Sequence, residues 1–241
     1  MVLVTKELLV QMMPESSEVI EPFVGPLNEG LSAHRIDTPL RVAAFLSQAG
    51  HESVRFTTMS QSLNYSTKGL LRVFPQFFTT EQAIEYAHKP LRIASRIYAG
   101  RLGNRDEQST DGWWYRSRGL FPKILGAAYY RRCGESLAGD PLMFLRRPEL
   151  LSTPLWAVRA AIWFWAENGC NELADDTSEQ GFRRLTRRIN GGLHGLQDRL
   201  YLYEQAKQLL SKESASNNKH TTPCTLQEGT GANAPGAGQH K

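Results

Sequence analysis

Residues 49–53 read Ala49-Gly50-His51-Glu52-Ser53 and follow an apolar run, residues 40–46, that predicts a buried helix. Thr38 can cap this helix, and Pro39 suits its first position, where a missing N–H costs nothing. The apolar run stops at Gly50, so we expect Glu52 at or just past the C-terminus of the helix.

Glu52 has two interpretations at this position. The last carbonyls of a helix carry partial negative charge, which disfavours an ionised carboxylate, and a partly dry site would hold the proton more tightly still. A carboxyl group that stays protonated near neutral pH is what a general acid needs. The alternative is that Glu52 is an exposed charge at a helix end, and its position alone leaves both open.

The composition is that of a soluble globular protein with one good core. The chain has 241 residues, of which 41% are hydrophobic and 22% charged. No stretch approaches the roughly 18 apolar residues that a membrane helix needs, so we expect no membrane insertion. The N-terminus lacks the long apolar run and cleavage site of a signal peptide. The protein is therefore expected to be made in the cytoplasm.

The formal net charge of +4 would suit an anionic partner such as nucleic acid, a membrane surface or a cell-wall polymer. Four arginines between 183 and 188 are typical of a solvated helix face that could also meet wall phosphates. No nucleic-acid motif accompanies them, so no nucleic-acid partner is expected. The three cysteines lie far apart, without a CxxC pair or a His/Cys cluster, which predicts reduced thiols and no zinc site.

The hydrophobic periodicity predicts a mainly α-helical domain over residues 1–212, with irregular loops at 53–66 and 100–119 and no convincing sheet. Residues 120–133 are expected to form one helix. Residues 213–241 are polar and of low complexity, and they predict a disordered tail.

Residues 100–119 combine glycines, charges and aromatic side chains without a helical period. Long irregular loops are usually functional or disordered, and the aromatic residues argue against disorder. Stacked rings beside charged donors suit a sugar-binding surface, with Trp113 as a candidate contact. The alternative is a surface loop that its aromatic residues pin to the core.

Several short motifs, taken together and in order, resemble glycoside hydrolase family 19, which includes chitinases and phage endolysins. The resemblance covers about residues 5–210. The motifs are Pro26-Leu27-Asn28, Arg41-Val42-Ala43-Ala44-Phe45-Leu46-Ser47-Gln48, His51-Glu52-Ser53, Leu63-Asn64-Tyr65-Ser66, Tyr98-Ala99 with Gly103-Asn104, Asp111-Gly112-Trp113, Arg116-Ser117-Arg118-Gly119 and Arg188-Ile189-Asn190-Gly191-Gly192.

The resemblance implies a two-lobed, lysozyme-like helical domain with a substrate cleft. It also implies cleavage of β-1,4 bonds next to N-acetylglucosamine in chitin or peptidoglycan, with inversion and without metal or cofactor. Glu52 matches the general acid of the family, and His51 is its neighbour in the motif. The positions that match residues lining the cleft or supporting its carboxylates are Asn64, Tyr65, Arg116, Arg118 and Asn190.

The sequence departs from the family pattern at important positions. Endolysin-like members usually carry their second carboxylate where this chain has Gln61, a cleft glutamine has become Pro122, and an asparagine has become Ala128. Gln61 can bind a water molecule but cannot take its proton. A substitute base is sought among the acidic residues of the aromatic loop, which are Asp106, Glu107 and Asp111.

Two hypotheses follow. The leading one is a monomeric cell-wall glycan hydrolase, slowed by the loss of its base. The other is an inactive relative that binds cell-wall glycan without cleaving it. The sequence leaves chitin and peptidoglycan open as substrates. A phage or prophage setting, in which a holin or another export route releases the protein to the bacterial wall, is the expectation for location.

Overall fold

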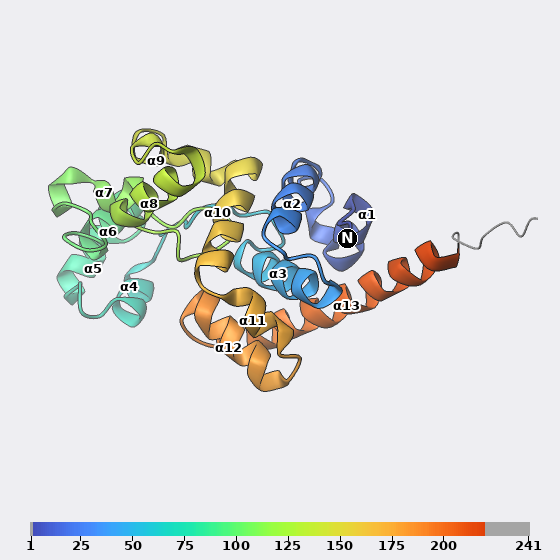
Figure 1. The fold of residues 1–241 in the computed structure, drawn as a ribbon. Coiled ribbons are helices and arrows are strands. Elements are labelled where there is room, and N and C mark those ends of the chain that lie inside the picture. The colour runs from blue at the N-terminus through green and yellow to red at the C-terminus, as the bar shows by residue number, and fades with distance from the viewer. Residues whose placement is uncertain (1, 220–241) are drawn as a thin grey trace, which may run out of the picture.

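The computed structural model describes residues 2–219, and side chains as far as residue 212. The described part is helical and contains no named β-strand (Figure 1). Its elements, in chain order, are α1 (Lys6–Met12), η1 (Pro14–Ser16), α2 (Glu21–Ala33), α3 (Pro39–Glu52), α4 (Thr67–Val73), α5 (Thr80–Tyr86), α6 (Pro90–Ile97), η2 (Glu107–Ser109), α7 (Asp111–Trp114), α8 (Ala127–Ala138), α9 (Met143–Arg146), η3 (Pro148–Ser152), α10 (Pro154–Glu167), α11 (Cys170–Asp175), α12 (Glu179–Asn190) and α13 (Leu196–Lys219).

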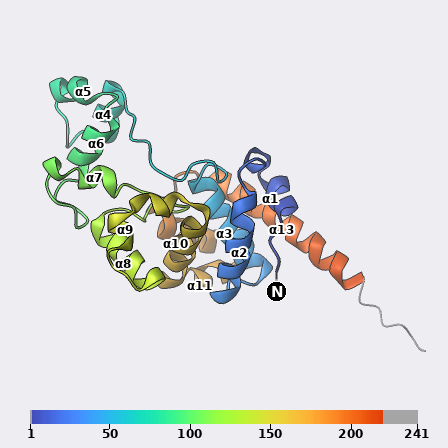
Figure 2. The same ribbon diagram turned by 90° about the horizontal axis from the view of Figure 1, so that it is seen from above.

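Two separate clusters of buried side chains divide the molecule into two lobes. The large lobe is built on α1–α3 and α8–α13. The small lobe has its own core, and Figure 2 shows its helices α4–α6, with α7 beside α6, set apart from α1–α3 and joined to α3 by an extended segment. The small-lobe core consists of Leu63, Leu70, Phe78, Ala83, Tyr86, Ile93, Ala94 and Ile97. The prediction of a mainly α, two-lobed domain is confirmed.

The helix α3 lies in the centre of the large lobe and ends at Glu52. The Thr38 hydroxyl accepts a hydrogen bond from the Arg41 N–H at 3.2 Å, and Pro39 occupies the first turn, as predicted. From Val42 to Gly50 every residue of α3 is buried. Its neighbours include α13, which packs along it, and the central apolar helix α10, whose Trp165 meets Phe45 edge to face at 5.4 Å.

The predicted helix at 120–133 is wrong in its first half, because α8 starts only at Ala127. Residues 116–126 instead form an irregular segment that folds back on itself. The Arg118 N–H donates to the Ile124 carbonyl at 3.2 Å, and the Gly126 N–H donates to the Tyr115 carbonyl at 2.7 Å. Backbone bonds of this kind within a loop leave no signal in the hydrophobic periodicity from which the helix was predicted.

The loop predicted at 100–119 contains two short helices, η2 and α7. The tail predicted at 213–241 lies mostly outside the described residues, and its first part, as far as Lys219, continues α13. This helix projects beyond the other helices in Figure 1. Among residues 2–219, no helix has the length and apolar character needed to span a membrane.

Candidate active site

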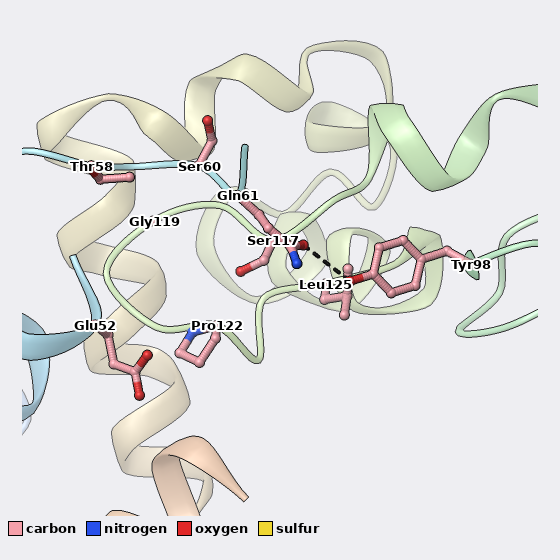
Figure 3. Close-up of a pocket in the computed structure, with 9 residues that line it drawn as sticks. All are labelled: Glu52, Thr58, Ser60, Gln61, Tyr98, Ser117, Gly119, Pro122 and Leu125. Atoms are coloured by element: carbon pink, nitrogen blue, oxygen red, sulfur yellow. Dashed lines mark hydrogen bonds between the residues drawn. The ribbon is translucent and has the colours of Figure 1, made fainter. Parts of the chain in front are cut away.

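A cavity of about 370 Å³ opens between the two lobes (Figure 3). The large lobe contributes Glu52 from the end of α3, and Tyr98 follows α6 in the small lobe. The remaining wall comes from the two connecting segments, residues 53–66 and 115–126. The lining residues are Glu52, Thr58, Ser60, Gln61, Tyr98, Ser117, Gly119, Pro122 and Leu125.

The two connecting segments pair across the back of the cavity. Ser60 and Arg118 form an isolated antiparallel bridge. Next to it, the Gln61 N–H donates to the Ser117 carbonyl at 3.0 Å, and the Gly119 N–H donates to the Met59 carbonyl at 2.9 Å. These bonds hold the backbone of Gln61 in a fixed position on the cavity wall.

The chain reverses sharply between Glu52 and this wall. Val54, Arg55 and Phe56 all have left-handed backbone angles, with φ of 50°, 60° and 63°. Such angles are uncommon for residues other than glycine, and a run of three requires support from its surroundings. The Arg55 N–H donates to the Gly50 carbonyl at 2.6 Å, and the Phe56 side chain is buried in the large-lobe core.

Glu52 is held by side chains from two other helices. Its carboxylate oxygen Oε1 accepts hydrogen bonds from the Asn190 amide at 3.0 Å and from the guanidinium of Arg199. The Glu52 side chain is 11% exposed, whereas Arg199 is fully buried. The structure therefore brings Glu52 and Asn190 together, both of which were predicted site residues.

Arg199 belongs to a buried polar network that the sequence reasoning missed. Its guanidinium also donates to the Gln48 side-chain oxygen at 2.6 Å and to the His194 carbonyl at 3.1 Å. The Gln48 amide in turn donates to the Thr186 hydroxyl at 3.1 Å. Gln48 precedes Glu52 by one helical turn on the same face of α3, and this spacing was the available signal. The network fixes the Glu52 carboxylate against α12 and α13.

Gln61 lies on the opposite side of the cavity from this network. Its side-chain oxygen accepts a hydrogen bond from the Tyr98 hydroxyl at 3.1 Å, shown dashed in Figure 3. Burial raises the pKa of Tyr98, so its hydroxyl stays a proton donor. Among the lining residues, Glu52 is the single carboxylate.

The three acidic residues considered as substitute bases do not line the cavity. Asp106 caps η2 by accepting from the Ser109 N–H at 2.9 Å. Glu107 accepts from the Tyr86 hydroxyl at 2.7 Å. Asp111 is held by Arg105, whose hydrogen bond lowers the pKa of the Asp111 carboxyl. Each carboxylate thus stabilises the loop that contains it.

His51 does not line the cavity either. Its ring nitrogen Nδ1 lies 2.5 Å from Asp198 at the start of α13, and Arg55 donates to the same carboxylate at 2.9 Å. The hydrogen bond from Arg55 is the main reason that the pKa of Asp198 falls to about 2. His51 therefore helps to join α3 to α13 behind the Glu52 backbone.

The predicted contacts of the small lobe also lie outside the cavity lining. The Asn64 side-chain oxygen lies 3.0 Å from the His88 ring, and Tyr65 meets Phe74 edge to face. The Arg116 guanidinium stacks on Trp113 at 3.7 Å from the ring centroid.

The arginines at 116 and 118 support the wall from behind. Burial lowers the pKa of Arg116 to about 10, and its Nε has no hydrogen-bond partner within residues 2–212. Arg118 is buried and donates to the Tyr130 hydroxyl at 2.8 Å and to the Trp114 carbonyl. Within the described part of the chain, no group of three or more His, Cys, Asp or Glu side chains could hold a metal ion.

Comparison with known proteins gives the family. The fold is similar to chitinase C from Streptomyces griseus, with a TM-score of 0.56 and 19% identity over 86% of this chain and 76% of that one. The sequence is 43% identical over 166 residues to a glycosyl hydrolase family 19 domain-containing protein of Haemophilus influenzae. That alignment covers 68% of this chain and 77% of the relative. The chain belongs to glycosyl hydrolase family 19.

Another relative is an endochitinase of Arabidopsis thaliana, 32% identical over 135 residues, which are 49% of this chain and 47% of that protein. No family model matches the sequence. Family 19 membership supports a glycoside hydrolase, and it confirms the resemblance that the motifs indicated.

Proposed function

We propose that this family 19 protein is a slow hydrolase of cell-wall glycan that cleaves β-1,4 bonds next to N-acetylglucosamine. The observation that carries the proposal is the single carboxylate of the cavity, Glu52, fixed by Asn190 and Arg199 at one end of the cleft. Since Oε1 accepts both of these hydrogen bonds, it is the other carboxyl oxygen, Oε2, that in the protonated form of Glu52 gives its proton to the glycosidic oxygen as the bond to the leaving sugar breaks.

An inverting reaction also needs a general base that activates the attacking water, and this cleft has no carboxylate at the position of that base. Water must attack from the opposite face of the sugar, helped by a base about 6.5–9.5 Å from the acid. Gln61 is the residue at the family's base position, and an amide can orient that water but cannot remove its proton. Loss of a general base typically slows a reaction by about 10²–10⁴-fold.

Peptidoglycan is the substrate that we propose, with chitin as the alternative. The formal net charge of +4 favours an anionic wall polymer over neutral chitin. The names of the endochitinase and chitinase C relatives support chitin. The proposed place of action is the bacterial cell wall, reached through a holin or another export route.

Release of soluble fragments from purified peptidoglycan and from chitin, by the protein and by Glu52→Gln, tests the proposal. We expect slow release from peptidoglycan that the substitution abolishes, because a side-chain amide cannot supply the proton. Equal release by both proteins would contradict the role of Glu52.

Binding of cell-wall glycan without cleavage is the second candidate function. The hydrogen bond between Gln61 and Tyr98 favours it, because it engages the residue at the base position in a neutral contact. Co-sedimentation with peptidoglycan, without fragment release even after prolonged incubation, is the result that would select this function over hydrolysis.

A further inference from the structure

The centre of the cleft presents hydrogen-bond donors where a carboxylate would present only acceptors. The Gln61 side-chain oxygen is occupied by the Tyr98 hydroxyl. A side-chain amide carries two N–H donors on its nitrogen, and no side chain or carbonyl within residues 2–212 accepts a hydrogen bond from them. The amide nitrogen is thus free to bind an acceptor on a molecule in the cavity.

The orientation of this amide is fixed before any ligand binds. The Gln61 backbone donates to Ser117, which holds the base of the side chain. The Tyr98 hydroxyl holds its tip, and Tyr98 is itself half-buried. A donor that is already positioned loses little rotamer freedom on binding, which increases its contribution to affinity and selectivity.

The surroundings of the amide show what kind of acceptor fits. Pro122 and Leu125 contribute apolar surface to the same cavity, and the Ser117 hydroxyl contributes a polar group. No cation lines the cavity, so nothing there favours a charged acceptor. A neutral carbonyl oxygen attached to a small apolar group matches this combination.

We propose that Gln61 is a specificity-determining residue that donates a hydrogen bond to the carbonyl oxygen of a sugar's acetamido group, while Pro122 and Leu125 receive its methyl group. Tyr98 is the positioning residue, since it holds the Gln61 oxygen and so directs the amide nitrogen toward the ligand. The inference rests on the proposed function, which places a β-1,4-linked N-acetylglucosamine glycan in this cleft.

Binding calorimetry with two neutral ligands tests the proposal. One is a hexamer of N-acetylglucosamine, and the other is the β-1,4-linked hexamer of glucose, in which a hydroxyl replaces each acetamido group. The full chain should bind the acetylated hexamer roughly tenfold more tightly, as one oriented hydrogen bond and a buried methyl group would give.

Two variants separate the parts of the proposal. Tyr98→Phe removes the hydroxyl that positions the amide and should reduce the preference for the acetylated hexamer roughly threefold, with thermal unfolding confirming that the variant is folded. Gln61→Glu replaces the donors by acceptors and should remove the preference. It should instead favour a hexamer of glucosamine, whose ammonium groups donate to a carboxylate.

The outcomes distinguish this proposal from the proposed function. Equal binding of both neutral hexamers by the unmodified protein would overturn the role of Gln61 and leave glycan binding intact. The same conclusion would follow if both variants kept the full acetyl preference. If neither hexamer nor peptidoglycan fragments bound at all, the proposed function itself would fall, and the acetamido contact with it.

Discussion

The side chain of Gln61 decides whether this cleft has a general base for hydrolysis. Glutamine and glutamate have nearly the same shape, so the cleft can keep its geometry while losing its base. The amide also changes which ligand groups the cleft can bind. A carboxylate accepts hydrogen bonds from donors on the ligand, whereas the amide nitrogen donates to acceptors on the ligand. Replacing Gln61 by glutamate should therefore speed hydrolysis and weaken the binding of acetylated glycan.

Gln61→Glu is predicted to raise the turnover of peptidoglycan hydrolysis by roughly 10²-fold or more, because it restores a group that can take the proton of the attacking water. Its affinity for acetylated glycan should fall at the same time. Initial rates over a range of substrate concentrations separate kcat from KM. The control is Gln61→Asp, which has the charge but a shorter side chain. No gain with glutamate would mean that other changes, such as Pro122 and Ala128, have also disabled the cleft.

Arg199 is the residue whose loss should affect Glu52 most. Removing one partner of a buried ion pair typically destabilises a protein by about 3–5 kcal/mol. Arg199 is fully buried beside Glu52 and Gln48. We expect Arg199→Met to lower the free energy of unfolding by roughly that amount, measured by chemical denaturation. The exposed Arg187→Met on α12 is the control and should change it by less than about 0.5 kcal/mol.

Among the individual site residues, Glu52 and its partner Asn190 could be predicted from the sequence, because both belong to motifs of the family. It could not identify Arg199, which follows the last motif and is recognisable only by what it contacts. Tyr98 is part of a motif, yet its role depends on the neighbour at position 61, which is distant in sequence. Of the predicted contacts, Trp113 lies in α7 and packs against the small-lobe core. Arg118 lies behind the cavity wall, since the direction of side chains along an irregular segment cannot be predicted from the local sequence.

Capping residues and hydrophobic periodicity predict well the helices that build the two cores. The predicted cap Thr38 accepts a hydrogen bond at the start of α3, and Ser66 and Thr79 do the same at the starts of α4 and α5. The start of α8 was missed because residues 120–126 are apolar enough for a helix but are held by bonds to Tyr115 and Arg118. The cleft wall thus depends on backbone bonds between segments, among them those from Gln61 to Ser117 and from Gly119 to Met59, which local rules do not describe.

The junction between α3 and α13 should be sensitive to acid. The pKa of Asp198 lies at about 2, below its ordinary value of 3.8, chiefly because of the hydrogen bond from Arg55. A carboxyl group with a lowered pKa in the folded state stabilises the protein fully above the unfolded pKa. That contribution is lost as the pH falls from about 4 through about 2.

Asp198→Asn is therefore expected to lower the melting temperature at neutral pH and to reduce its dependence on pH between about 4 and 2. Thermal unfolding at a series of pH values measures both effects. Asp37→Asn, at an exposed position, provides the comparison. Parallel pH curves for the protein and Asp198→Asn would contradict the stabilising role of this junction.

Because the molecule has two separate hydrophobic cores, a destabilising substitution in one lobe should leave the other lobe folded. Leu70 is completely buried in the small-lobe core. Leu70→Ala should destabilise that lobe by roughly 2–5 kcal/mol through lost burial and the cavity left behind. Hydrogen exchange should then accelerate in α4–α6 and much less in α10.

The comparison for this experiment is Ile84→Ala, also in the small lobe but 64% exposed, which should leave exchange in both lobes nearly unchanged. Equal acceleration of exchange in α4–α6 and α10 by Leu70→Ala would show that the two lobes unfold as one cooperative unit.

The left-handed turn at Val54, Arg55 and Phe56 also limits how the chain can change in length. The wall beyond it is extended around the bridge at Ser60, where neighbouring side chains point to opposite faces. One residue inserted or deleted between Glu52 and the bridge would turn Gln61 away from the cavity and bring a neighbour into its place. Insertions and deletions should therefore be far less tolerated here than exchanges of side chain, and cleft redesign should keep this spacing constant.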